Sequence, residues 1–149
     1  EINKIYGPVE SYMAHSLGGL ALALAMQEIK HDANHRLAFI APATETTTAI
    51  NFFFKFLKLD EAVRKEFDLL ILRLSGRPAS DFSVALAMKN IKASICWYHD
   101  EDDLITPLAD ALNVKEQNYS NVKFVISKGL GHSRIYRDNK VSKSVIEFL

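Results

Sequence analysis

Three segments of the chain hold side chains that could do chemistry together. Ser16 lies within "AHSLGG" at residues 14–19, a run of carboxylates lies within "HDEDDLITP" at residues 99–107, and His132 lies within "GLGHS" at residues 129–133. An imidazole can take the proton of a serine hydroxyl while a carboxylate holds the imidazole in place. A serine, a carboxylate and a histidine could therefore act together here, provided that the fold brings them close to one another.

Short apolar runs alternate with helical segments along most of the chain. Strands are predicted at residues 9–15, 36–41, 93–99 and 122–127, and helices at residues 17–30, 107–117 and 139–149, after the tail of a helix at residues 1–6. Alternation of this kind is typical of an α/β fold, a three-layer structure in which helices flank a parallel sheet.

The three reactive segments all follow predicted strands. Active sites of open parallel sheets form beyond the carboxyl ends of their strands. Ser16 follows the first predicted strand, the four carboxylates of residues 100–103 (the acidic loop) follow the third, and His132 follows the fourth. We therefore expect all three to meet at one edge of the sheet.

These motifs, in this order, resemble the α/β-hydrolase superfamily of serine esterases and lipases, in its C-terminal part only. The resemblance covers nearly the whole chain except residues 44–77. It implies an eight-stranded sheet of which the last four strands are found here, so we expect an upstream segment that carries the first strands. The chain would then be a single domain over residues 1–149, with residues 44–77 as a helical cap or lid.

The resemblance gives the residues around Ser16 specific roles. The serine would occupy a sharp turn between strand and helix, the nucleophile elbow, which needs small residues two positions before and after it. Ala14 and Gly18 meet that need, and Gly19 would let the helix approach neighbouring backbone. The backbone N–H of Leu17 would donate to an oxyanion. The alternative is that Ser16 only caps the helix.

The acidic loop offers more than one candidate acid. The family usually has Gly-x-x-Asp-x-x-Val-Pro here, and alignment on residues 106–107 gives Asp103 the acid position and Asp100 the glycine position. Asp102 is the alternative acid. The loop could instead be merely solvated, or Asp100 and Asp102 could hold a cation, although no glycine supplies the turn of a calcium loop.

Five histidines compete for the role of base, and His132 is the predicted one because two glycines precede it in a flexible turn. His15 precedes the serine and is expected to support the turn. His99 ends a strand and is expected to be structural. His31 and His35 lie before the second predicted strand, at the opposite end of the sheet, and are expected at the surface.

Residues 44–77 break the alternation with two predicted helices, joined at residues 59–61 and ended by Gly76. The first helix is more apolar than one buried stripe requires. It is either buried on two sides or forms a lid whose aromatic face lines an acyl pocket. Its large apolar residues are Ile50, Phe52, Phe53, Phe54, Phe56 and Leu57.

Composition excludes several classes of function. The 149 residues carry 18 basic and 18 acidic side chains, so no net charge favours nucleic acid or an acidic membrane surface. The apolar run at residues 17–26 is too short to span a bilayer. The single cysteine, Cys96, is expected in the core and fits a reducing compartment, and no signal peptide is visible, so a cytoplasmic location is expected.

The predicted function is a serine hydrolase that cleaves a small carboxylic ester or thioester through an acyl-enzyme. Acyl transfer or hydrolysis of an amide or lactone on the same residues is one alternative, and a non-catalytic binding or interaction module is another. No phosphate-binding, metal-binding or redox motif is present in the sequence, so no cofactor or metal is expected. An open edge on the first predicted strand would favour self-association.

Overall fold

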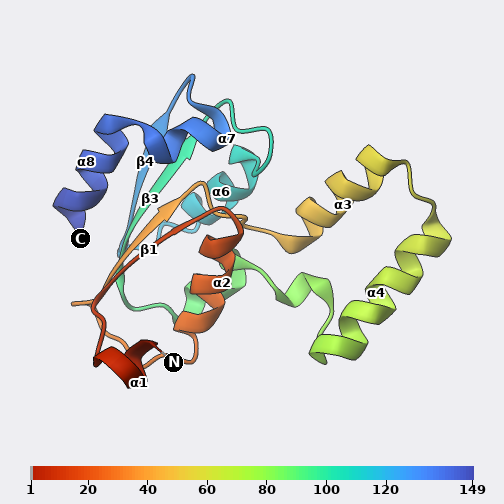
Figure 1. Cartoon of the computed structure of the whole chain (residues 1–149), viewed down its shortest axis with the longest axis horizontal. Coiled ribbons are helices and arrows are strands. Elements are labelled where there is room, and N and C mark those ends of the chain that lie inside the picture. The colour runs from red at the N-terminus through yellow and green to blue at the C-terminus, as the bar shows by residue number, and fades with distance from the viewer. Residues whose placement is uncertain (1) are drawn as a thin grey trace.

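The computed structural model describes residues 2–149, with side chains from residue 4 onward. Its centre is a four-stranded sheet in the order β1 (Ser11–His15), β2 (Arg36–Ile40), β3 (Ser94–Asp100) and β4 (Val122–Ser127). In Figure 1 the sheet lies between α8 on one side and α2 on the other. All three pairings between neighbours are parallel. The predicted α/β fold with a parallel sheet is confirmed, and each strand lies within one residue or two of its predicted bounds.

Helices cover both faces of the sheet, and the alternation of side chains along the central strands explains why. Leu37 and Phe39 of β2 pack with α2 (Leu17–Met26) and α6 (Leu108–Lys115). Ala38 and Ile40 pack on the opposite face with α8 (Asn139–Phe148). Strands that are buried on both faces read as continuous apolar runs, which is the pattern of β2 and β3.

Several elements differ from the expected ones. Helix α1 covers Ile2–Tyr6, and Glu1 lies outside the described residues. Helix α2 ends at Met26 rather than residue 30, because the chain turns there and Ile29 packs back on the core. Short helices that periodicity cannot detect lie between longer elements: η1 (Ala79–Asp81), α5 (Val84–Ala87), η2 (Met88–Asn90), α7 (Gly131–Arg134) and η3 (Ile135–Arg137).

Helices α3 (Thr46–Leu57) and α4 (Glu61–Ser75) form a hairpin that extends away from the sheet (Figure 1). The Asp60 side chain accepts a hydrogen bond from the Val63 N–H at the start of α4, and Gly76 ends α4 at φ 72°, as predicted. Only Ile50 and Phe54 of α3 are buried, against α4 and η1. The interpretation that α3 is buried on two sides is wrong, because α4 covers one stripe and leaves four residues 46–73% exposed: Phe52, Phe53, Phe56 and Leu57.

Strand β1 has β2 as its one neighbour within the described residues. It is thus an edge strand of the sheet that the described residues form, and edge strands are the places where sheets can extend. Self-association through this edge stays a prediction. None of the helices in the described part of the chain is long and apolar enough to cross a bilayer.

The close approach of α2 to the segment after β2 depends on Gly19. A Cβ atom at this position would lie 2.5 Å from the Pro42 Cβ, whereas one at Gly18 would lie 3.8 Å from the Ala14 Cβ. We predict that Gly19→Ala lowers the free energy of unfolding by about 1–3 kcal/mol through overpacking. Gly18→Ala, the matched control, should leave it unchanged or raise it by up to about 1 kcal/mol. Urea unfolding measures both, and equal losses would contradict this account of Gly19.

Candidate active site

Ser16 joins β1 to α2 in a strained backbone conformation, with φ 56° and ψ −128°. Sheet and loop hold it there, because its N–H donates to the Ile40 carbonyl at 3.1 Å and its own carbonyl accepts from Gly19 and Ala43 at 2.9 Å each. A non-glycine residue persists in such a conformation only where its surroundings determine it. The Ser16 hydroxyl makes no capping bond to α2, so the simple helix-cap interpretation is wrong.

The small residues around Ser16 lie where the turn needs them. Ala14 and Gly18 face each other across it, and Gly19 abuts Pro42. Leu17 occupies the first position of α2, where a backbone N–H has no partner inside the helix. The Leu17 side chain is largely exposed.

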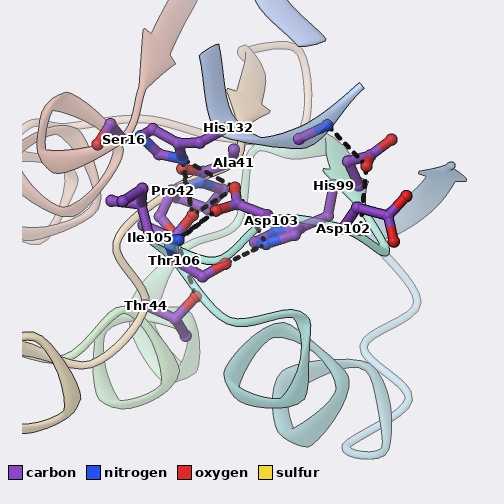
Figure 2. A network of polar contacts seen from close by, with 12 residues as sticks. Ser16, Ala41, Pro42, Thr44, His99, Asp102, Asp103, Ile105, Thr106 and His132 are labelled. Carbon is purple, nitrogen blue, oxygen red and sulfur yellow. Dashed lines mark hydrogen bonds and ion pairs between the residues drawn. The ribbon is translucent and has the colours of Figure 1, made fainter. Parts of the chain in front are cut away.

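Asp103 is held rigidly and faces His132 (Figure 2). Its Oδ2 lies 2.8 Å from the His132 Nδ1 and accepts from the Thr106 hydroxyl at 2.8 Å. Its Oδ1 accepts from the N–H groups of Ile105 and Thr106 at 2.9 Å each. Burial raises the pKa of Asp103, but the hydrogen bonds from His132, Thr106 and Ile105 outweigh it and hold the pKa below its usual value. The carboxylate is therefore charged at neutral pH.

The other predicted acids lie close by but point elsewhere. The Oδ2 of Asp102 accepts from the Gly129 N–H at 2.9 Å, away from the His132 ring. Asp100 is fully buried and accepts hydrogen bonds from the segment that precedes His132. A merely solvated loop is therefore wrong for Asp100 and Asp103. Within residues 4–149, no group of three or more histidine, cysteine or acidic side chains could hold a metal ion.

His132 connects the carboxylate to the serine. Its Nε2 lies 2.9 Å from the Ser16 Oγ, and the ring is 12% exposed. Because Nδ1 faces the acceptor-only carboxylate of Asp103, the proton belongs on Nδ1, and Nε2 is left to accept from the Ser16 hydroxyl. This arrangement can take the serine proton while the serine oxygen attacks an electrophilic carbon.

His99 and His15 support the site in different ways. His99 is fully buried, with Nε2 donating to the Thr106 carbonyl at 2.7 Å and Nδ1 accepting from Trp97 at 3.3 Å. Burial lowers its pKa, so it stays neutral and structural, as expected. The His15 Nε2 donates to the His132 carbonyl at 3.1 Å, so His15 supports the histidine rather than the serine turn.

The remaining histidines lie far from this edge, near the start of β2, as expected. They are half-buried rather than fully at the surface, because the His31 Nδ1 donates to the Ile29 carbonyl and its Nε2 accepts from the Lys92 N–H. His35 pairs with Asp32. Cys96 is buried in the core, as expected.

An apolar cavity of about 220 Å³ is lined in part by Leu17, the residue that follows Ser16. Helix α2 forms one wall, and Phe53 of α3 and Phe67 of α4 form another. A larger cavity of about 470 Å³ lies under the hairpin, is lined by charged side chains such as Arg64 and Asp68, and contacts none of the three polar residues of the site. The lining of the smaller cavity does not include Ser16, Asp103 or His132 either, but it includes Leu17, the residue after the serine, which makes this cavity the candidate for binding a group next to Ser16.

We predict that acid destabilises the protein through this site. The pKa values of Asp103 and Asp100 lie below their usual values, so each contributes stability that is complete above about pH 4 and is lost as the pH falls through the folded-state pKa. Asp103→Asn should lower the free energy of unfolding at pH 7 and reduce its loss between pH 7 and pH 3. Glu66→Gln, at an exposed position of α4, is the control. Urea unfolding at pH 7 and pH 3 measures the free energy of unfolding of each variant. If this free energy falls between the two pH values as much in Asp103→Asn as in the wild type, the prediction is wrong.

No protein-family model matches the chain, and no curated protein sequence does. Among solved structures, an esterase from Pyrococcus furiosus is 18% identical with a TM-score of 0.67, and the alignment covers 99% of this chain and 56% of that one. The esterase domain of a Rhodothermus marinus protein is 17% identical with a TM-score of 0.67, over 98% of this chain and 61% of that one.

A peptidase also resembles the chain. An acylaminoacyl peptidase is 16% identical with a TM-score of 0.64, over 99% of this chain and 24% of that one. The chain thus spans little more than half the length of the esterases that it matches. The match extends over nearly all of this chain, whose parallel sheet is flanked by helices, so the chain has the fold of these enzymes, the α/β-hydrolase fold.

Proposed function

We propose that this chain is the catalytic part of a serine hydrolase that cleaves carboxylic esters or thioesters. Ser16 is the nucleophile, His132 the general base and Asp103 the residue that orients the imidazole. The observation that carries the proposal is the unbroken sequence of contacts from Asp103 to His132 at 2.8 Å and from His132 to Ser16 at 2.9 Å. The likeness to esterases supports an ester as the bond that is cleaved.

The reaction follows from the proton positions. The His132 Nε2 takes the Ser16 proton as Oγ attacks the carbonyl carbon, and Asp103 stabilises the resulting imidazolium. The N–H of Leu17, at the positive end of α2, donates to the oxyanion. Collapse of the tetrahedral intermediate expels an alkoxide or thiolate, which takes the proton from His132. In the second half of the reaction His132 takes a proton from a water molecule whose oxygen attacks the acyl carbonyl, and it returns that proton to the Ser16 Oγ as the carboxylic acid leaves.

The resemblance to α/β-hydrolases assigns a second oxyanion donor to a loop outside these residues. Loss of one such donor typically lowers the rate by about 10²–10³. The activity proposed here is therefore that of the intact protein. Acyl transfer and amide or lactone hydrolysis would use the same three side chains. The arrangement of Ser16, His132 and Asp103 therefore does not distinguish these reactions, and the choice of an ester must be tested with substrates.

The cavity at Leu17 supports an apolar acyl group. Its walls are almost wholly apolar, and the α3–α4 hairpin supplies several of them. We propose that residues 44–77 act as a cap whose Phe53 contacts the acyl chain, within a single catalytic domain. An acyl chain that enters the cavity gains about 0.8 kcal/mol for each buried methylene.

The nucleophile can be tested by covalent labelling of the intact protein with a fluorophosphonate probe, followed by intact mass and peptide mapping. We predict one adduct on Ser16, none in Ser16→Ala, and loss of labelling in His132→Ala. Asp103→Asn should slow labelling by about 10⁴, the loss expected when the imidazole takes the wrong tautomer.

Asp102→Asn is the matched control for the acid, because this neighbouring carboxylate contacts Gly129 and not the His132 ring. It should label at nearly the wild-type rate. Equal slowing in the two asparagine variants would contradict the assignment of Asp103. An intact protein that is not labelled would favour a binding module.

The cavity can be tested with p-nitrophenyl esters of increasing acyl length. We predict that kcat/KM rises with chain length until the cavity is filled, and that Phe53→Ala flattens this dependence because it removes a wall. Phe52→Ala is the control, since this exposed neighbour on α3 does not line the cavity. An unchanged chain-length profile in Phe53→Ala would remove the cavity from the substrate site.

A further inference from the structure

The acidic loop and the segment that carries His132 are joined residue by residue. Residues 128–132 are here called the histidine loop. Asp103 contacts His132, the Asp102 carboxylate accepts from Gly129, and the Glu101 carboxylate lies 3.1 Å from the Lys128 ammonium. Each of these three consecutive acidic residues therefore has its own partner in the histidine loop.

The carboxylate of Asp100 is fully buried and accepts four hydrogen bonds, as many as that of Asp103. Its Oδ1 accepts from the Gly131 N–H at 2.8 Å and from the Asp102 N–H at 3.0 Å. Its Oδ2 accepts from the Ser127 hydroxyl at 2.7 Å and from the Leu130 N–H at 3.2 Å. Hydrogen bonds to a charged acceptor are about twice as strong as neutral ones. Burial raises the pKa of Asp100, but these bonds outweigh it and lower the pKa, so the carboxylate stays charged.

The histidine loop has a conformation that needs this support. Gly129 and Gly131 adopt left-handed backbone angles, with φ 85° and 61°. The N–H groups of three successive residues, 129 to 131, converge on the carboxylates of Asp100 and Asp102. Successive backbone N–H groups in such turns form an anion-binding concavity, and here the anion comes from the protein itself. Glycines lose more conformational freedom than other residues, so a loop of this composition is costly to fix.

We propose that Asp100 is a positioning residue for His132. By holding the N–H groups of Leu130 and Gly131, its carboxylate fixes the backbone immediately before His132, so that the imidazole stays within hydrogen-bond distance of both Ser16 and Asp103. The resemblance to α/β-hydrolases places a glycine at this position, so the contribution of Asp100 is a property of this chain. Its consequence for catalysis rests on the proposed function, whereas its consequence for the position of His132 does not.

A second contact completes the restraint from the other side. The His132 carbonyl accepts from the His15 Nε2, and the two rings lie 4.6 Å apart. The backbone of His132 is thus fixed before the residue through Gly131 and after it through its own carbonyl. The imidazole has little freedom left except rotation about its side-chain bonds.

The test compares Asp100→Ala and Asp100→Asn with wild type in the intact protein. Asparagine keeps an acceptor for Gly131 but turns an amide N–H₂ toward the Leu130 N–H, so it should show the smaller effect. Glu101→Gln is the control, because it removes an exposed ion pair between the same two loops without touching a buried N–H. Circular dichroism and the melting temperature establish which variants fold.

Two readouts separate positioning from stability. The first is the downfield proton resonance of the His132 Nδ1–H bonded to Asp103, assigned by its loss in His132→Gln. The second is fluorophosphonate inactivation, resolved into its maximal rate and its half-saturating concentration. We expect Asp100→Ala to lose the resonance and to inactivate at least about tenfold more slowly at saturation with an unchanged half-saturating concentration, since a 1 Å misplacement can cost about 10² in rate. Glu101→Gln should match wild type.

The outcomes divide clearly. A folded Asp100→Ala with the wild-type resonance and inactivation rate overturns the proposal, as does a wild-type protein that lacks the resonance. If Asp100→Ala fails to fold, wild-type values for Asp100→Asn overturn it in the same way. If the wild-type protein is not inactivated but the resonance is lost in the Asp100 variants, Asp100 positions His132 and it is the hydrolase proposal that fails.

Discussion

The hydrogen bond between the Asp103 carboxylate and the His132 Nδ1 is the interaction on which the rest of the site depends. It selects the tautomer that leaves Nε2 facing Ser16, and it holds a charge in a place from which water is nearly excluded. A buried carboxylate is costly unless its oxygens are bonded, and Thr106 and Ile105 supply those bonds. The turn that precedes α6 therefore stabilises the charged form of Asp103.

The parallel sheet supplies the frame for this bond. Because β1, β3 and β4 run in one direction, their carboxyl ends meet at one edge, and the strained turn at Ser16 is tied to β2 through the Ile40 carbonyl. The fold fixes the serine by backbone bonds, whereas it fixes the histidine by side chains of the acidic loop. The glycine-containing histidine loop therefore depends on the carboxylates of the acidic loop, whereas the turn at Ser16 does not.

The sequence predicted the four strands and the edge at which Ser16, Asp103 and His132 meet, because apolar runs and strand order depend on local pattern. It could not predict Asp100, since the value of that carboxylate comes from backbone N–H groups about thirty residues away. The one hint in the sequence was the pair of glycines before His132, which indicates a loop that needs contacts from elsewhere to be held in place. Nor could the sequence decide between the two interpretations of α3, because composition does not tell how many sides of a helix are covered; Phe52 and Phe56 are in fact exposed.

The central claim is that Ser16 carries the acyl group during turnover. The most direct measurement is rapid-quench mass spectrometry of the intact protein mixed with a p-nitrophenyl ester, with peptide mapping of the quenched sample. The account predicts a transient mass increase equal to the acyl group, located on the peptide that contains Ser16 and absent in Ser16→Ala. Ester hydrolysis that proceeds at the wild-type rate in Ser16→Ala, with no acylated peptide, would contradict it.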